Sequence, residues 1–403
     1  MLRNSLVIVS VALLLVLSSC GGTPAVKEEQ MNTSLVPYPY YALYGELFTK
    51  LTDLNALIKS QRQDKKSDTA FGVELLAANS NRGEALLKER AFKATCLTLD
   101  RLRDLGVQGI ALSIQYPILT RSFPHSSEYR RFYQRVAQEV RRRGFLLIVE
   151  MGTIFHEPEF SQVRVDYRGL TMERFQKELR EMAEAIIEDV RPDHLTLFTE
   201  PDTHSRNTGL DFTVSNFAAT VRYAAQGLMH KGVRLGAGAG TWNDIAYFEA
   251  LMNIPELDDI NLHIYPIQND LVVDRVMRVA VMAREHQKSV SIGEAWLYKV
   301  STRELGGISP VEAFTRDVYS FWGPLDQLFL EMTVNISHLI DAEFCSFFWM
   351  KYLYGYLDYN TQTMNLRPQQ LINSVDEISG QRILDNTLNE TGESFKKLIN
   401  AER

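Results

Sequence analysis

Short apolar runs alternate with longer amphipathic stretches along most of the chain. The runs have the length of buried strands, and the stretches between them repeat apolar residues about every 3.6 positions, as surface helices do. Strands are expected at 71–76, 107–114, 145–151, 194–199, 233–238, 260–266, 289–295 and 343–350. Helices are expected at 84–104, 126–143, 171–190, 212–231, 244–252, 270–287, 310–340 and 380–401.

Buried strands that alternate with helices are typical of parallel βαβ units. Eight of each is the number that a closed (β/α)₈ barrel needs, so the sequence predicts an α/β fold, a single TIM barrel. The alternative is a doubly wound open sheet, which would carry a glycine-rich phosphate turn after its first strand. The sequence has no such turn there, and "GAGAG" at 236–240 follows the fifth strand, where small residues suit a barrel strand end.

The first residues form a separate segment. Arg3 precedes an apolar stretch from Leu6 to Leu17 that is too short to span a bilayer comfortably, and "LSSC" closes it at Cys20. This segment resembles a bacterial lipoprotein signal, and the alternative is an ordinary secretory signal with an incidental cysteine. The resemblance implies a signal peptide at 1–19 and a lipid on Cys20. The polar, proline-bearing residues that follow predict a tether at 20–40, and the barrel pattern places one domain at 41–403. It also implies an exported protein, anchored by lipid to a membrane of the bacterial cell envelope.

Composition excludes several other classes of function. The chain is 45% hydrophobic and 23% charged, with a net charge of −7, which is the profile of a globular protein. It has no basic patch with interleaved aromatic residues, so nucleic acid is not an expected partner. Cys96 and Cys345 lack the spacing of zinc ligands. We expect no metal, no cofactor and a monomer.

Two glutamates occupy positions where a barrel carries its chemistry. Glu200 follows the fourth expected strand directly and precedes Pro201, and Glu294 lies at the end of the seventh. Function sits at the carboxyl ends of barrel strands, so both carboxylates should project over one mouth. A pair with one protonated and one ionised member is what glycosidic cleavage requires. The alternative is a structural layer of ion pairs with arginines at the rim.

The motifs around these glutamates resemble those of clan A of the glycoside hydrolases, the retaining (β/α)₈ glycosidases, with the β-galactanase and β-mannanase branches nearest in character. The similar motifs are "TEP" (199–201), "GEAW" (293–296), "HIYP" (263–266) and "FFW" (347–349). The resemblance implies that Glu200 is the general acid/base and Glu294 the nucleophile. It also implies that a residue of "HIYP" hydrogen-bonds the nucleophile.

Substrate-binding residues are expected around the same mouth. The resemblance places Trp349 under the sugar at the cleavage point, with Tyr265 and His263 beside the nucleophile. Thr199 stands where the family has an asparagine that binds the sugar 2-hydroxyl, which puts activity or the usual sugar preference in question. Other candidates, from their places at or after strand ends, are Trp296, which shares the strand parity of Glu294, Trp242, Gln115, Tyr116 and His156. Glu74 and Glu150 are interpreted as structural.

The sequence thus predicts a glycosidase that cleaves a β-linked oligo- or polysaccharide with retention of configuration. The carboxyl groups of Glu200 and Glu294 should then lie about 5–5.5 Å apart. The Tyr265 hydroxyl should reach Glu294, and the pKa of Glu200 should be raised. Two alternatives stay open: a non-catalytic or weakly active glycan-binding lipoprotein at the cell surface, and a barrel enzyme for a phosphorylated substrate with "RELGG" (303–307) as an anion loop.

Overall fold

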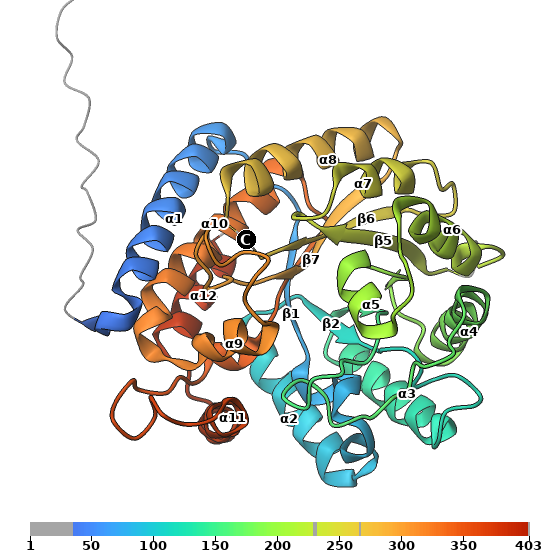
Figure 1. Cartoon of the computed structure of the whole chain (residues 1–403), viewed down its shortest axis with the longest axis horizontal. Coiled ribbons are helices and arrows are strands. Elements are labelled where there is room, and N and C mark those ends of the chain that lie inside the picture. Colours follow the sequence, from blue (N-terminus) through green and yellow to red (C-terminus); the bar gives the residue numbers. More distant parts are fainter. Residues whose placement is uncertain (1–34, 229–231, 266, 402–403) are drawn as a thin grey trace, which may run out of the picture.

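The chain folds into a closed barrel of eight parallel strands surrounded by helices (Figure 1). The computed structural model describes residues 35–228, 232–265 and 267–401. The strands pair in chain order, and the last pairs with the first. They are β1 (Ala70–Glu74), β2 (Gly109–Ser113), β3 (Leu146–Glu150), β4 (His194–Thr196), β5 (Arg234–Gly240), β6 (Asp259–Ile264), β7 (Ser289–Ala295) and β8 (Phe344–Phe347). The predicted fold class, a single (β/α)₈ barrel, is confirmed.

Helices cover the outside of the barrel, and apolar side chains between helices and strands form the main core. The α-helices are α1 (Tyr41–Arg62), α2 (Glu89–Leu105), α3 (Ser126–Arg142), α4 (Met172–Ala185), α5 (Pro201–Thr208), α6 (Val214–Ala225), α7 (Ile245–Met252), α8 (Arg275–Glu285), α9 (Pro310–Thr315), α10 (Gly323–Ile340), α11 (Pro368–Leu384) and α12 (Glu390–Ala401). None of the described helices is long and apolar enough to cross a membrane.

Prolines explain where the expected helices were wrong. The stretch expected as one helix at 310–340 is two, α9 and α10, and each has a proline in its first turn. Proline suits the start of a helix because its missing N–H would have no partner there. Pro368 likewise begins α11 well before residue 380, so the helix expected at 380–401 is the end of α11 followed by α12.

The sequence pattern also missed α1, which precedes the barrel. This helix packs against α10, where the Asn55 side-chain amide donates to the Leu328 carbonyl oxygen at 2.9 Å. Its buried face includes Leu47, Leu51 and Ile58, so it belongs to the core. Cys20 and the expected signal peptide lie outside the described residues.

The "GAGAG" sequence is strand β5, and its small residues let neighbouring backbone approach closely. A Cβ atom added at Gly238 would lie 1.7 Å from the Asn261 carbonyl oxygen on β6. No side chain fits there without moving one strand away from the other. The close pairing of β5 with β6 therefore depends on glycine at this position.

We expect Gly238→Ala to destabilise the protein by about 3 kcal/mol or more, because the added methyl group overpacks the barrel wall. Gly380→Ala on α11 is the matched control, because nothing lies within 4 Å of a Cβ built there. In a helix interior this control change is stabilising by roughly 0.5–1 kcal/mol. Urea unfolding midpoints measure both. Equal midpoints for Gly238→Ala and the unsubstituted protein would contradict the packing described above.

Candidate active site

A cavity of about 1350 Å³ opens at the carboxyl ends of the strands. Glu200 and Glu294 both line it, as does the imidazole of His263. The two glutamate side chains keep 14% and 18% of their surface exposed, so a ligand in the cavity can reach them. The structure thus brings the two predicted carboxylates to one mouth.

Glu200 lies at the junction between strand β4 and helix α5. Its backbone has φ 38°, in the left-handed region that residues other than glycine rarely adopt. Pro201 then starts α5, whose first turn is closed by a hydrogen bond from the His204 N–H to the Glu200 carbonyl oxygen at 3.1 Å. Such strained conformations persist where the surrounding structure imposes them, which is common at functional sites.

Glu294 reaches the mouth because strand β7 carries a bulge at Gly293. Leu262 pairs with Ile292, whereas the next residue of β6, His263, pairs with Glu294. The extra residue sets Glu294 beside His263. Only glycine fits at the bulge, since a Cβ at Gly293 would lie 2.0 Å from the Glu150 carboxylate.

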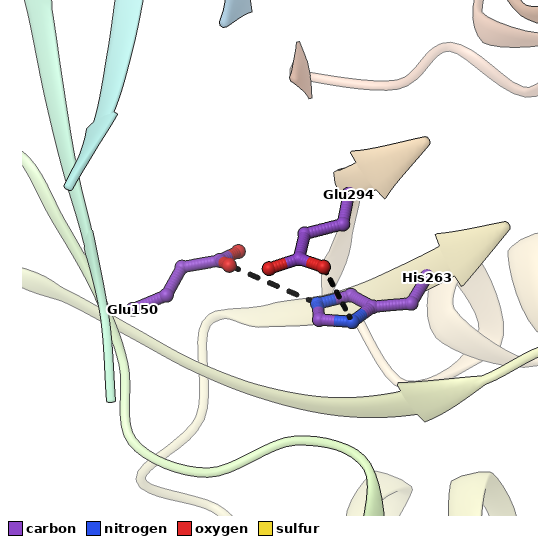
Figure 2. A group of neighbouring side chains, drawn as sticks. All are labelled: Glu150, His263 and Glu294. Atoms are coloured by element: carbon purple, nitrogen blue, oxygen red, sulfur yellow. Dashed lines mark ion pairs between the residues drawn. The ribbon is translucent and has the colours of Figure 1, made fainter. Parts of the chain in front are cut away.

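The imidazole of His263 lies among three carboxylates. Its Nδ1 atom is 2.7 Å from Glu200 Oε1 and 3.7 Å from Glu294 Oε2. Its Nε2 atom is 3.8 Å from Glu150 Oε2. Figure 2 shows the ring between Glu150 and Glu294, with the three side chains arriving from different strands. Only 2% of His263 is exposed, so water does little to weaken these interactions.

The carboxylates hold a proton on His263. Burial alone would lower the pKa of the imidazole, but the charges of Glu294, Glu200 and Glu150, together with the hydrogen bond to Glu200, raise it to about 10. At neutral pH the ring is therefore an imidazolium, and Nδ1–H donates to Glu200. Its positive charge sits between the two candidate catalytic groups.

The two candidate carboxyl groups titrate in the opposite order to the one predicted. Burial would raise the pKa of Glu200, but the hydrogen bond and charge of His263 lower it overall. Burial raises the pKa of Glu294 well above its usual value; the charge of His263 opposes this rise, and the neighbouring carboxylates add to it. The prediction of a raised pKa for Glu200 is wrong for the free protein, because the imidazolium lies closer to Glu200 than to Glu294.

The expected contact between Tyr265 and the presumed nucleophile is present. The Tyr265 hydroxyl donates to Glu294 Oε2 at 2.5 Å. Tyr265 follows strand β6 and is 7% exposed, with its ring 5.6 Å from that of Trp242. The indole N–H of Trp242 in turn donates to Asp202 Oδ2 at 3.0 Å, which fixes the orientation of that ring.

Four more predicted residues line the same cavity, and three do not. Thr199, Gln115, Trp242 and Trp349 line it. The ring of Trp349 packs on Phe348, with centroids 4.2 Å apart, and Phe314 lies on the cavity wall beside it. The remaining three candidates, Tyr116, His156 and Trp296, are not among the cavity-lining residues.

The three misplaced residues have other partners. The Tyr116 hydroxyl donates to the Glu178 carboxylate on α4, and the His156 ring contacts the Asn207 carbonyl oxygen. Trp296 is 1% exposed and stacks on Tyr352. The argument from strand parity failed for Trp296 because β7 ends at Ala295, before the alternation reaches it.

Two glutamates interpreted as structural are cavity residues. Glu74 and Glu150 are the last residues of β1 and β3, and both line the cavity. Glu74 accepts hydrogen bonds from Asn79 and Ser113, both at 2.6 Å, and burial raises its pKa to about 7. Glu150 accepts from the Asn261 amide at 2.7 Å. Their places at strand ends were a signal in the sequence, and it was underrated.

His204 is a further cavity residue that the sequence analysis missed. It lies on α5, one turn after Glu200, and stacks on Phe198. Its Nδ1 atom is 2.9 Å from the Thr153 hydroxyl. Burial lowers the pKa of this imidazole to about 4, so it is neutral where His263 is charged. Its spacing of four residues from Glu200 on a helix was the available signal.

Metal and phosphate sites fit the geometry less well. Donor atoms of Glu150, His263 and Glu294 lie within 4.8 Å of one another, close enough for a metal ion. The pKa of His263 is raised to about 10, so a metal ion would have to displace a proton from the imidazolium, either the Nδ1 proton donated to Glu200 or the Nε2 proton that faces Glu150. In the "RELGG" loop, the carboxylate of Glu304 already accepts from the Ser301 N–H and from Arg316, so a negative charge of the protein itself occupies these two donors.

The comparisons with known proteins agree with the fold. No protein-family model and no curated protein matches the chain. A variant of GH5_18 from Bifidobacterium longum, solved in complex with Manβ1-4GlcNAc, is 11% identical, with TM-score 0.50 over 83% of this chain and 78% of that one. An exo-β-1,4-mannosidase from an Opitutaceae bacterium is 12% identical, with TM-score 0.53 over 84% of this chain and 60% of that one. At such low identity the likeness establishes the barrel fold alone.

We expect the His263 imidazole to stay protonated well above pH 6.5, the usual histidine pKa. Glu200→Gln removes one negative charge and replaces the carboxylate that accepts the Nδ1 proton with a neutral amide, so the pKa of His263 should fall toward that value. Histidine ¹⁵N chemical shifts measured against pH report both states. Glu377→Gln, at an exposed position of α11, is the control and should leave the titration unchanged. A His263 that titrates near pH 6.5 in the unsubstituted protein would contradict this account.

Proposed function

We propose that this protein is a retaining glycoside hydrolase that cleaves a β-linked glycan. One observation supports this most directly: Glu200 and Glu294 both lie within 3.7 Å of the same His263 nitrogen. Their nearest oxygens can be no further apart than the sum of the two distances. That upper limit falls just below the roughly 6.5–9.5 Å by which inverting enzymes separate their carboxyl groups, so it favours the shorter spacing of a retaining pair.

In the proposed reaction, Glu294 attacks the anomeric carbon while Glu200 donates a proton to the leaving oxygen. Water, activated by Glu200, then hydrolyses the glycosyl ester on Glu294. The pair needs one proton in total, and the raised pKa of Glu294 with the lowered pKa of Glu200 supplies one on Glu294. Substrate binding must therefore move this proton to Glu200. Tyr265 contacts Glu294, where the proton starts, and His263 contacts Glu200, where it must arrive.

The cavity walls suit a sugar. Trp349 and Trp242 present flat rings, which stack on the apolar faces of pyranoses. Polar groups beside them have unused hydrogen-bonding capacity: Gln115 Oε1 and Trp349 Nε1 are buried without a partner. The GH5_18 variant, which shares the fold, was solved with the disaccharide Manβ1-4GlcNAc. We infer that an oligosaccharide fills the corresponding space here.

A glycan-binding protein without turnover is the second candidate. Thr199 lines the cavity directly before Glu200, where the resemblance to clan A would place an asparagine. A threonine cannot supply that amide to the sugar 2-hydroxyl, and such contacts contribute several kcal/mol in the transition state. Loss of the contact would weaken catalysis more than binding.

Substrates whose leaving groups differ in their need for a proton separate the roles of Glu200 and Glu294. Glu200→Gln should reduce kcat/KM by about 10²–10⁴-fold for an oligosaccharide, whose leaving oxygen needs a proton. It should reduce the first step far less for a 2,4-dinitrophenyl β-glycoside, whose leaving group departs as an anion. Glu294→Gln should abolish both activities. Initial rates on a panel of β-glycosides give these numbers, with Glu377→Gln as control. Equal losses for both leaving groups in Glu200→Gln would argue against its role as the acid.

Thr199→Asn separates the two candidate functions. If the protein is an enzyme, the added amide should keep or raise kcat/KM on a substrate with a free 2-hydroxyl. A glycan-binding protein would bind the glycan in both forms and release no reducing ends in either. Reducing-end assays and calorimetric binding on the same glycans distinguish these results. Turnover that Glu294→Gln abolishes would eliminate the pure binding protein.

We also propose that the enzyme works at the bacterial cell envelope, held by a lipid on Cys20. The support is the "LSSC" sequence that ends the apolar run near the N-terminus. Cys20→Ser should shift the protein from the membrane fraction to the soluble fraction of cells. Mass spectrometry of the N-terminal peptide is the direct measurement. A soluble unsubstituted protein with an unmodified Cys20 would refute the anchor.

A further inference from the structure

The cavity extends beyond the catalytic groups into a groove between helices α2 and α11. Its lining residues on α11 recur at the spacing of one helical face, as do those on α2. From α11 they include Ile372, Asp376, Gly380 and Ile383, and from α2 they include Lys93, Ala94 and Leu97. We refer to this space as the α2–α11 groove. It is continuous with the space around Glu200 and Glu294.

One end of the groove is closed. Arg101, near the C-terminal end of α2, donates to the carbonyl oxygens of Ile383 and Leu384 at 2.9 and 3.0 Å. These bonds tie the two helices together where α11 ends. Nearer the barrel mouth, Lys351 follows β8 and pairs with Asp376 of α11 at 2.8 Å, linking the helix to the catalytic side of the molecule. Figure 1 shows α11 at the edge of the molecule, beside α2.

The groove differs chemically from the part of the cavity around the strand ends. The aromatic residues that line the cavity all come from the strand ends and the segments after them, and none comes from α2 or α11. The groove presents aliphatic side chains, with Leu97, Ile372 and Ile383 half-buried, and polar ones such as Lys93 and Asp376 beside them. At Gly380 nothing lies within 4 Å of a built Cβ, so the space there is open. Sugars prefer flat aromatic rings, whereas aliphatic walls suit an aliphatic chain.

Exposed apolar side chains also gather at this helix. Among the described residues, eight large hydrophobic side chains are exposed, and three of them are Met364, Ile378 and Leu384, in or just before α11. Leu384, which lines the end of the groove, is 57% exposed. Uncovered apolar surface that adjoins a ligand cavity marks a place where apolar surface of a ligand can be buried.

We propose that the α2–α11 groove binds an aliphatic chain on the aglycone of the substrate, so that the enzyme acts on a glycolipid. This inference rests on the proposed function. The sugar lies between Glu200 and Glu294, and the chain leaves the cleavage point along the groove toward Arg101. The chain buries Leu97, Ile372 and Ile383, and it passes over Gly380.

The experiment uses the purified full-length protein and a series of alkyl β-glycosides from methyl to octyl, below their micelle concentrations. Calorimetry gives Kd and hydrolysis gives kcat/KM for each. Complete burial of one methylene changes affinity about fourfold, so a half-open groove should give roughly twofold per methylene. Octyl has four more methylenes than butyl, so we expect about a sixteenfold gain between them. Octyl glycoside offered in phospholipid vesicles shows whether a chain already held by a membrane is also accepted.

Two variants separate the groove from other binding surfaces. The Cβ atom of Gly380→Trp meets open space, and the ring should fill the groove and reduce the gain from butyl to octyl below twofold. Glu377→Trp adds the same ring to an exposed position of α11 that does not line the cavity, and it should keep the full gain. Glu377→Trp should also leave hydrolysis of a methyl or short aryl glycoside unchanged, because Glu377 lies outside the cavity.

The possible results discriminate clearly. The proposal is supported if affinity rises with chain length, and if Gly380→Trp removes this rise while Glu377→Trp keeps it. The same pattern in Kd without a change in kcat/KM also supports it. Hydrolysis without any dependence on chain length would overturn the groove and leave the glycosidase intact. Affinity that grows with added sugar units, not with added methylenes, would assign the groove to a longer glycan and overturn the proposal. An unchanged gain in Gly380→Trp would place the chain elsewhere and overturn it as well.

Discussion

A buried imidazolium among carboxylates is the interaction on which the site depends. His263 is 2% exposed, yet it keeps its proton because Glu150, Glu200 and Glu294 surround it. Burying one of these charges alone would be prohibitive, whereas together they offset one another. The same charge keeps the pKa of Glu200 low, whereas burial raises the pKa of Glu294 well above its usual value. Catalysis by this pair therefore requires the substrate to alter a balance that His263 sets.

The barrel wall is shaped to allow this arrangement. The bulge at Gly293 brings Glu294 beside His263, and the missing side chain leaves room for the Glu150 carboxylate. Asn261 on β6 then donates to Glu150 and to Thr196, so these three buried polar side chains are joined inside the barrel. On the other side, the left-handed backbone of Glu200 starts helix α5 four residues after the end of strand β4. The strained backbone and the close packing therefore position the side chains of Glu200 and Glu294, the two groups that react in the proposed mechanism.

Sequence reasoning predicted the barrel and the pair of glutamates well because both depend on simple periodicity. Eight apolar runs predicted eight strands, and the C-terminal ends of the fourth and seventh strands met at one mouth. Contacts between strands were less accessible. Nothing local to Glu150 shows that it lies against His263, which is more than one hundred residues away in the chain. The predicted order of the pKa values of Glu200 and Glu294 was wrong for the same reason, because it depends on Glu200 lying one ångström closer than Glu294 to His263 Nδ1. The prediction that Trp296 lines the site was wrong because strand β7 ends at Ala295, one residue before it.

The central claim is that Glu294 forms a covalent bond with the sugar while Glu200 handles the proton. A 2-deoxy-2-fluoro β-glycoside with a 2,4-dinitrophenolate leaving group tests it most directly. The fluorine slows both the formation and the hydrolysis of the glycosyl ester, but the good leaving group keeps formation fast, so the ester accumulates. With the sugar that the enzyme hydrolyses best, peptide mass spectrometry should find one sugar per chain, bound through an ester to Glu294. An adduct on Glu150, Glu200 or Glu74, or turnover of the parent glycoside with inverted configuration and no adduct, would contradict the account.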